Sequence, residues 1–383
     1  MRALWNLGFR PFFLFGGMWS ALHVLLWVLF QAGWISLPLQ DPMVWHAHEM
    51  IFGFASAMVA GFLLTASQNW TGIQGVHGKK LKILVLLWIS ARVLSVTNEN
   101  LHGVYALVDL SFYPMLGWYL KPYLANSVQK RNWIFLFLFF VLFLANLIIH
   151  NAYFQWFSLP DPRATLLLSM YAIVMMISVI GGRVIPFFTN NAVPNTNPFR
   201  HPLLEKFTEM SIAVSALAVF VHEFSIITAL LCGATAIIHL LRWFFWKPWK
   251  SRSVPILWIL YVGYLWIPIG FVLRALASAS MILPSSSTHA FTAGAIGTMI
   301  YGMTTRVALG HSGRPIRASR WIVAGYVAIV LCAVIRVFGP LFDPAHYLWH
   351  IQVSGLLWFF AFALFTAIYA PILTQPRADG KNG

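Results

Sequence analysis

Charged side chains are scarce in this chain. Only 9% of its 383 residues are Asp, Glu, Lys or Arg, whereas 60% are hydrophobic. Soluble domains contain about 25% charged residues, so this composition excludes a water-soluble protein. We therefore expect an all-α polytopic membrane protein in which residues 1–383 form a single membrane domain.

Cysteine and the motifs of soluble enzymes are nearly absent as well. Cys232 and Cys332 lie in apolar runs without a CxxC spacing, which is typical of small packing residues. The motifs GxxxxGK(S/T) and HExxH do not occur, and no GxGxxG opens a cytosolic helix. ATPases, metalloproteases and Rossmann-fold enzymes therefore lack their sequence signatures here.

Long apolar runs are abundant instead. Windows of about 20 apolar residues, the length of a membrane-spanning helix, lie near residues 11–31, 45–67, 81–96, 102–120, 133–150, 164–182, 206–221, 225–244, 254–278, 288–309, 321–338 and 347–371. This pattern predicts twelve transmembrane helices embedded in the lipid bilayer.

The basic residues account for the net charge of +15, and they gather in every second loop. Two of these loops carry Lys79, Lys80 and Lys82, and Arg314, Arg317 and Arg320. Because basic loops stay in the cytoplasm, both termini are predicted to be cytoplasmic. The same loop distribution explains the charge without a nucleic-acid partner, and we expect none.

Ionisable residues lie at the start of the second apolar run, in the segment WHAHEM at residues 45–50. Such groups are costly at membrane depth and usually functional. Glu49 is the catalytic candidate, either as a proton relay or as the partner of a ligand imidazole. The alternative is that Glu49 only complements the helix dipole.

An internal repeat links the second and tenth apolar runs. His48, Gly53, Met58, Gly61 and Gly72 recur 241 residues later as His289, Gly294, Met299, Gly302 and Gly313. Arg92 and His102 recur as Arg336 and His346, 244 residues later. A weaker copy relates residues 176–183 to 299–306. Three arcs of four helices would follow from this repeat.

The repeat predicts a haem site. His48 and His289 would enter the membrane at equal depth, and the glycines below them would let a flat ligand approach. Three arginines near the same face could pair with haem propionates, or could instead snorkel to the interface. They are Arg92, Arg274 and Arg336.

Other histidines near this face allow further metal sites. His346 and His350 are four residues apart on one helical face and could hold copper together with His46, although such pairs also occur as plain hydrogen-bonding groups. His102, His150 and His222 are interpreted as interfacial hydrogen-bonding residues, with metal ligation as the alternative.

Five segments resemble the NnrS family of bacterial membrane proteins, over nearly the whole chain. They are NLGFRPFF at 6–13, WHAHEM at 45–50, GGRVIPFFTN at 181–190, HAFTAG at 289–294 and GHSGR at 310–314. The resemblance implies a haem- and copper-containing protein of the bacterial cytoplasmic (inner) membrane, linked to nitric oxide in denitrification and nitrosative stress. By family likeness, His46, His48 and His289 are the leading metal ligands.

The expected helix arcs also look like the catalytic subunit of haem-copper oxidases and nitric oxide reductases. The chain departs from that pattern, because residues 164–182 contain no histidine and residues 288–309 contain one near the outer face. A complete binuclear site of that type is therefore not expected at these positions.

We expect a protein with haem b and copper that binds nitric oxide and reduces two molecules of it to nitrous oxide. A quinol or another donor would supply the electrons, since no CxxCH motif or soluble redox domain is present. A non-catalytic nitric-oxide or metal-binding stress protein would use the same ligands and stays open. A twelve-helix transporter fits less well, because the repeat does not divide the chain into two halves.

Overall fold

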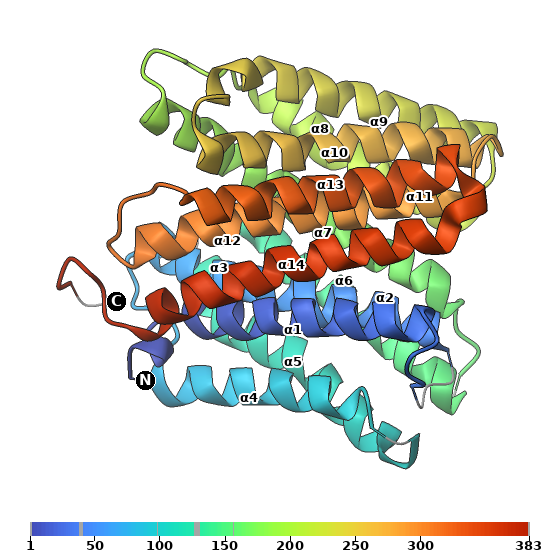
Figure 1. Cartoon of the computed structure of the whole chain (residues 1–383), viewed down its shortest axis with the longest axis horizontal. Helices are drawn as coiled ribbons and strands as arrows, with labels where there is room; N and C mark the ends of the chain where they lie inside the picture. Colours follow the sequence, from blue (N-terminus) through green and yellow to red (C-terminus); the bar gives the residue numbers. More distant parts are fainter. Residues whose placement is uncertain (1, 38–40, 98, 126–130, 156, 382–383) are drawn as a thin grey trace. The chain divides into compact units, whose positions relative to one another are not determined.

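The computed structural model describes residues 2–37, 41–97, 99–125, 131–155 and 157–381, and these residues form helices and loops without a strand (Figure 1). The first eight α-helices are α1 (Phe9–Gln31), α2 (Pro42–His48), α3 (Ser56–Thr71), α4 (Gly78–Leu94), α5 (His102–Leu124), α6 (Trp133–Phe154), α7 (Pro162–Ala192) and α8 (Pro202–His222). The others are α9 (Ile226–Phe245), α10 (Pro255–Ser278), α11 (Pro284–His289), α12 (Thr298–His311), α13 (Arg320–Phe342) and α14 (Tyr347–Thr374).

Eight helical segments in the described part of the chain are long and apolar enough to cross a membrane. They are Phe9–Gln31, Pro42–Thr71, Trp133–Phe154, Pro162–Ala192, Ile226–Phe245, Pro255–Ser278, Arg320–Phe342 and Pro344–Thr374. The prediction of an all-α membrane protein is confirmed at this level. The number of twelve spans, the orientation of the termini and the three arcs stay predictions.

Two π-helical segments interrupt the helices at the positions that the repeat relates. The segment η2 (Glu49–Ala55) joins α2 to α3, and η6 (Ala290–Gly297) joins α11 to α12. Each begins directly after the repeated histidine, His48 or His289. Widened turns of this kind are rare and occur frequently at functional sites. The backbone thus repeats the element order that the sequence pattern indicated.

The ends of the two repeated segments match as well. Gly72 and Gly313 follow α3 and α12 with φ of +72° and +69°, a left-handed conformation that glycine adopts without steric cost. The internal repeat between these two segments therefore extends from the histidine at the start to the glycine that ends the helix.

The chain divides into two compact units, each with its own core. Unit 1 comprises Met1–Ser169, Thr304–Ile316 and Phe362–Gly383, and unit 2 comprises Met170–Met303 and Arg317–Ala361. In unit 1, α1 packs on α3 and η2, and α5 packs on α4 and α6. In unit 2, α9 packs on α8 and α10, and α10 packs on η6. The single membrane domain expected from the sequence stays a prediction.

Close packing in unit 1 depends on a glycine between α1 and α3. A Cβ atom at Gly61 would lie 2.8 Å from Phe12 Cβ and 3.1 Å from the Phe13 ring. Small residues let helix backbones approach in membranes, where apolar burial alone does not favour helix association. This contact fixes the helix that continues from η2, and with it the segment that carries His48.

Candidate metal centre

Three metal-ligating side chains meet inside unit 1. His48 ends α2, Asp109 lies on α5 and His150 lies on α6, and each is at most 4% exposed. The Nε2 atoms of His48 and His150 lie 3.3 Å and 3.2 Å from the same oxygen, Asp109 Oδ2. One ligand atom from each residue lies within 4.8 Å of the other two. The three groups therefore converge on one point.

The π-helical segment explains how two consecutive residues face this point. In an α-helix, neighbouring side chains diverge by about 100°. The widened turn begins at Glu49, and both Glu49 and His48 enter the cluster, with 3.1 Å between His48 Nδ1 and Glu49 Oε1. Glu49 is fully buried. The local helix irregularity therefore places a carboxylate beside the imidazole.

Arg92 of α4 ties the two carboxylates together. Its Nη1 donates to Glu49 Oε2 at 2.8 Å and its Nη2 pairs with Asp109. The hydroxyl of Tyr105 donates to Glu49 Oε1 at 3.2 Å. Gly53 lies against this pair, because a Cβ there would be 2.9 Å from Arg92 Nη1 and from Glu49 Oε2. The predicted residues Glu49 and Arg92 thus belong to one buried network with His48.

Asn146 and His102 complete the surroundings of the three ligands. Asn146 Oδ1 accepts from His48 Nε2 at 2.9 Å, and its Nδ2 donates to Asp109 Oδ2 at 2.7 Å. His102 Nε2 lies 3.4 Å from His150 Nδ1, and its ring stacks on Tyr153 with 3.7 Å between centroids. Outer partners of this kind hold ligand side chains in orientation.

The charges of the network do not balance without a further cation. Glu49 and Asp109 carry two negative charges, and Arg92 carries one positive charge. An uncompensated charge is very costly in a low-dielectric interior. Both ring nitrogens of His48 face oxygen acceptors, so the compensating positive charge belongs at His48. A proton on His48 Nε2 or a metal ion in its place would supply it.

The donor set suits a first-row transition metal. Two imidazoles and a carboxylate are ligands of copper, zinc and iron, whereas magnesium and calcium favour oxygen alone. Ligand atoms bonded at about 2.1 Å to one ion lie about 3.0–3.4 Å apart in octahedral or tetrahedral geometry. The observed separations of 3.2 Å and 3.3 Å fall in this range.

His289 in unit 2 has the orientation of a ligand histidine. Its Nδ1 donates to the backbone carbonyl of Ser285 at 2.8 Å, which leaves the lone pair of a neutral ring on Nε2. Ligating histidines commonly donate their other N–H to a carbonyl in this way. Buried Arg274 lies beside it, with Nη2 3.3 Å from Thr288 Oγ1 and Nη1 2.5 Å from Glu223 Oε1. The orientation of His289 fits a ligand histidine, and the role of Arg274 as a propionate partner stays a prediction.

His46 and His48 lie in unit 1, whereas His289, His346 and His350 lie in unit 2. The haem site between His48 and His289 and the copper site of His46, His346 and His350 therefore stay predictions.

The structure gives these copper candidates other partners. His46 Nδ1 lies 3.0 Å from His23 Nε2, and its ring stacks on Trp27. His346 Nδ1 lies 2.9 Å from Asp343 Oδ1, and His350 Nε2 donates to the Asp343 carbonyl at 3.1 Å.

Asp109 was missed in the sequence, and His150 was interpreted as interfacial. A signal for Asp109 existed, because it is an acidic residue inside the apolar run 102–120 and such residues mark function. Asn146 offers no comparable signal, since an uncharged amide in an apolar helix is common at helix contacts.

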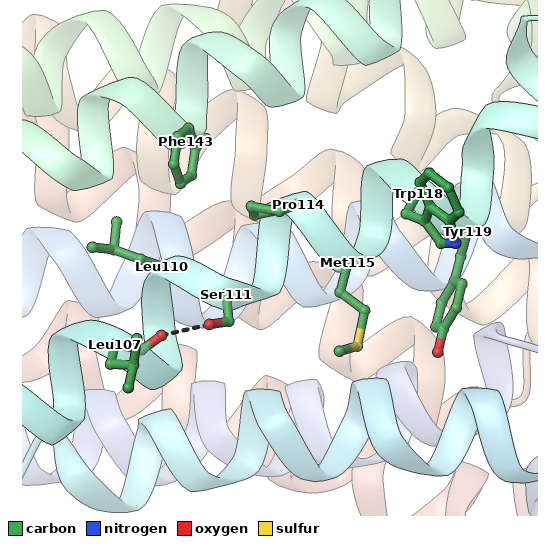
Figure 2. Close-up of a pocket in the computed structure, with 8 residues that line it drawn as sticks. All are labelled: Leu107, Leu110, Ser111, Pro114, Met115, Trp118, Tyr119 and Phe143. Carbon is green, nitrogen blue, oxygen red and sulfur yellow. Dashed lines mark hydrogen bonds between the residues drawn. The ribbon is translucent and has the colours of Figure 1, made fainter.

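A pocket on the other face of α5 does not belong to this centre. Figure 2 shows its lining of mainly apolar side chains, with Ser111 Oγ donating to the Leu107 carbonyl at 2.6 Å. The lining residues are Leu107, Leu110, Ser111, Pro114, Met115, Trp118, Tyr119 and Phe143. On a helix, the α5 positions 107, 111, 114 and 118 point away from Asp109.

The comparison with protein families gives a match over nearly the whole chain. A family model described as NnrS protein matches residues 3–377. No curated protein matches the chain at a significant level. The family match includes all the residues of the candidate centre.

Proposed function

The chain belongs to the NnrS family, and on that premise we propose that it is a metalloprotein of the bacterial inner membrane that binds nitric oxide and holds copper between His48, Asp109 and His150. The observation that carries the proposal is the buried network of two carboxylates and one guanidinium, in which two imidazole nitrogens face the same carboxylate oxygen. A metal ion at that point would place positive charge where the carboxylates outnumber the guanidinium, and it would use all three ligands.

Copper is the ion we propose, because nitrogen and oxygen donors suit copper(II) and copper binds such sites more tightly than the other divalent metals of its row. Copper also agrees with what resemblance to the family implies. Asn146 would hold Asp109 through Nδ2, Glu49 would hold His48 through Nδ1, and His102 would orient the His150 ring through Nδ1.

Haem b is proposed at His289. Haem iron supplies one-electron chemistry and a binding position for nitric oxide. In this chain, the hydrogen bond from His289 Nδ1 to the Ser285 carbonyl fixes the imidazole with the lone pair of a neutral ring on Nε2. Arg92 is paired with Glu49 and Asp109, and Arg274 is paired with Glu223. The roles of Arg92, Arg274 and Arg336 as propionate partners stay predictions.

Reduction of nitric oxide in denitrification or nitrosative-stress defence is the activity we propose. Two molecules of nitric oxide, two protons and two electrons give nitrous oxide and water. The observation that favours turnover is the set of proton-carrying groups at the centre, where Tyr105 donates to Glu49 and Glu49 accepts from His48. Nitric oxide is small and apolar enough to arrive through the bilayer.

The test is metal analysis and optical spectroscopy of the purified protein. We expect copper and haem b in the wild type, and a reduced spectrum that changes on adding nitric oxide. His48→Ala and His150→Ala should lose copper and keep haem, whereas His289→Ala should lose haem and keep copper. His222→Ala, on the loop side of α8, is the matched control and should keep both.

Two results would contradict the proposal. Absence of copper from the wild-type protein would show that the proposed copper centre does not exist. Unchanged copper content in both the His48 and the His150 variants would show that copper binds at another site. Nitrous oxide formation by the reduced protein, measured by gas chromatography, separates turnover from binding alone. Binding without nitrous oxide would leave a nitric-oxide-binding stress protein.

A further inference from the structure

The pocket beside α5 is about as long as one leaflet of a bilayer. Its volume is about 600 Å³, and it is open on one side, because Leu107 and Trp118 are 69% and 72% exposed. The lining extends from Leu107 to Tyr119 (Figure 2), which corresponds to about 18 Å along a helix. Half of the hydrocarbon core of a bilayer is about 15 Å thick. One acyl chain can therefore lie along this pocket.

The pocket is built into the backbone of α5. Pro114 lies in the interior of this helix, where proline removes one backbone hydrogen bond and bends the helix. Phe143 of α6 belongs to the same lining, and the hydroxyl of Ser111 already donates to the Leu107 carbonyl at 2.6 Å. This stretch of the pocket is therefore effectively apolar, which suits a hydrocarbon chain better than a polar ligand.

Polar groups gather at one end of the pocket. Figure 2 shows Trp118 and Tyr119 at the opposite end from Leu107. The indole N–H and the phenol hydroxyl can each donate a hydrogen bond, and tryptophan and tyrosine are typical of the membrane interface. Lys121 lies next to them, with Nζ 6.0 Å from the centroid of the Trp118 ring. A cation and two donors therefore mark this end.

Further lysines lie at the same end of the α4–α5 pair. The Tyr123 hydroxyl donates to the Gln74 carbonyl at 2.7 Å, so the end of α5 contacts the segment that leads into α4. Lys79 and Lys80 are exposed in the first turn of α4. Helix α4 packs on α5. The positive charge of this end thus comes from two neighbouring helices.

The surrounding segments supply no acidic residue to balance these lysines. Positions 50–98 and 110–160 contain neither Asp nor Glu, and the buried carboxylate of Asp109 is paired with Arg92. The loops with the lysines are predicted to face the cytoplasm. Anionic lipids of the cytoplasmic leaflet attract basic residues beside the membrane, so charge complementarity favours an anionic lipid over a zwitterionic one.

We propose that this pocket binds one anionic glycerophospholipid of the cytoplasmic leaflet. One acyl chain lies along α5 against Pro114 and Phe143. The phosphate lies at Lys121, where the donors of Trp118 and Tyr119 can reach it. Because α5 carries Asp109 on its other face, the lipid stabilises the helix that supplies this side chain to the buried network. The site contains no proposed metal ligand, so the inference is independent of the proposed function.

The experiment is native mass spectrometry of the full chain, titrated with dioleoyl phosphatidylglycerol or dioleoyl phosphatidylcholine. We expect the first phosphatidylglycerol to bind more tightly than the first phosphatidylcholine. Lys121→Gln should weaken the binding of phosphatidylglycerol by about five-fold, as loss of one basic residue near a membrane surface predicts, and leave phosphatidylcholine unchanged. Lys250→Gln is the matched control, because it removes the same charge from an exposed position of unit 2. It should bind like the wild type.

A second pair of variants tests the apolar part of the pocket. Ser111→Trp fills the space for the acyl chain and should remove the high-affinity binding of phosphatidylglycerol. Val104→Trp is its control, since Val104 lies on the same helix, is 51% exposed and does not line the pocket. This variant should keep the affinity of the wild type.

Equal affinity of the wild type for both lipids would overturn the proposal, because charge would then not select the ligand. Unchanged affinity for phosphatidylglycerol in both Lys121→Gln and Ser111→Trp would also overturn it, since the anionic lipid would bind elsewhere. Copper content is the separate readout of the metal centre, and both variants should retain the copper content of the wild type.

Discussion

Asp109→Asn changes the charge of the buried network with little change in shape. Asp109 Oδ2 is the atom that His48 Nε2 and His150 Nε2 both approach, at 3.3 Å and 3.2 Å. The amide that replaces it is neutral, so Arg92 and Glu49 balance each other and the network no longer requires a cation. We therefore expect the variant to lose its copper.

The expected decrease in copper affinity can be estimated from the loss of one anionic ligand. Removing an outer partner of a ligand typically weakens metal binding by 10–100-fold, so removing a direct anionic ligand should weaken it by at least about 100-fold. Folding should suffer less, because Arg92 keeps its pair with Glu49. Loss of one hydrogen bond to a charged group costs about 1.5–3 kcal/mol.

The assay is copper per chain by mass spectrometry, followed by competition with a copper chelator, with thermal unfolding of the metal-free proteins as the second readout. Asp41→Asn is the control, since Asp41 forms an exposed pair with Arg163 at 3.2 Å and such pairs contribute at most about 1 kcal/mol. If Asp109→Asn keeps the copper content and affinity of the wild type, the charge argument is wrong and His48 is only protonated.

Two other predictions concern packing and pH. Gly53→Ala places a Cβ 2.9 Å from Arg92 Nη1 and should lower the free energy of unfolding by about 1–3 kcal/mol. Gly117→Ala is the control and should not lower it, because the space around Gly117 is open. Thermal unfolding of both variants measures the difference. Hydrogen bonds from Arg377 lower the pKa of Asp379 to about 2. The stabilisation of the folded C-terminal segment by these bonds is therefore complete above the unfolded pKa of about 4 and is lost as the pH falls through 2. A nitroxide label at position 381 should gain mobility over that pH range, and equal mobility at pH 5 and pH 1.5 would refute the pairing.

The helical class and part of the centre follow from the sequence, because they depend on local patterns. The apolar runs predict helices through composition alone, and the repeat of His48 as His289 predicts equivalent segments that the two π-helices now confirm. Glu49 was selected as an ionisable residue at the start of an apolar run, and it contacts His48. Arg92 was selected as a propionate partner, and it pairs with Glu49 instead.

The remaining ligands depend on contacts between helices distant in sequence. Asp109 and His150 reach His48 through the packing of α5 against α6, and no local spacing relates the three residues. The π-helical turns have no evident local sequence pattern either, since η2 and η6 share only the equivalent glycines Gly53 and Gly294. Spacing within one helix therefore finds some of the site residues, whereas the others require the tertiary structure.

The electron paramagnetic resonance spectrum of copper in the purified protein tests the central claim most directly. We expect one copper(II) signal with hyperfine splitting from two imidazole nitrogens in the wild type, and no copper(II) signal in His150→Ala. A spectrum without nitrogen splitting, or one that His150→Ala and Asp109→Asn leave unchanged, would contradict the assignment of copper to His48, Asp109 and His150.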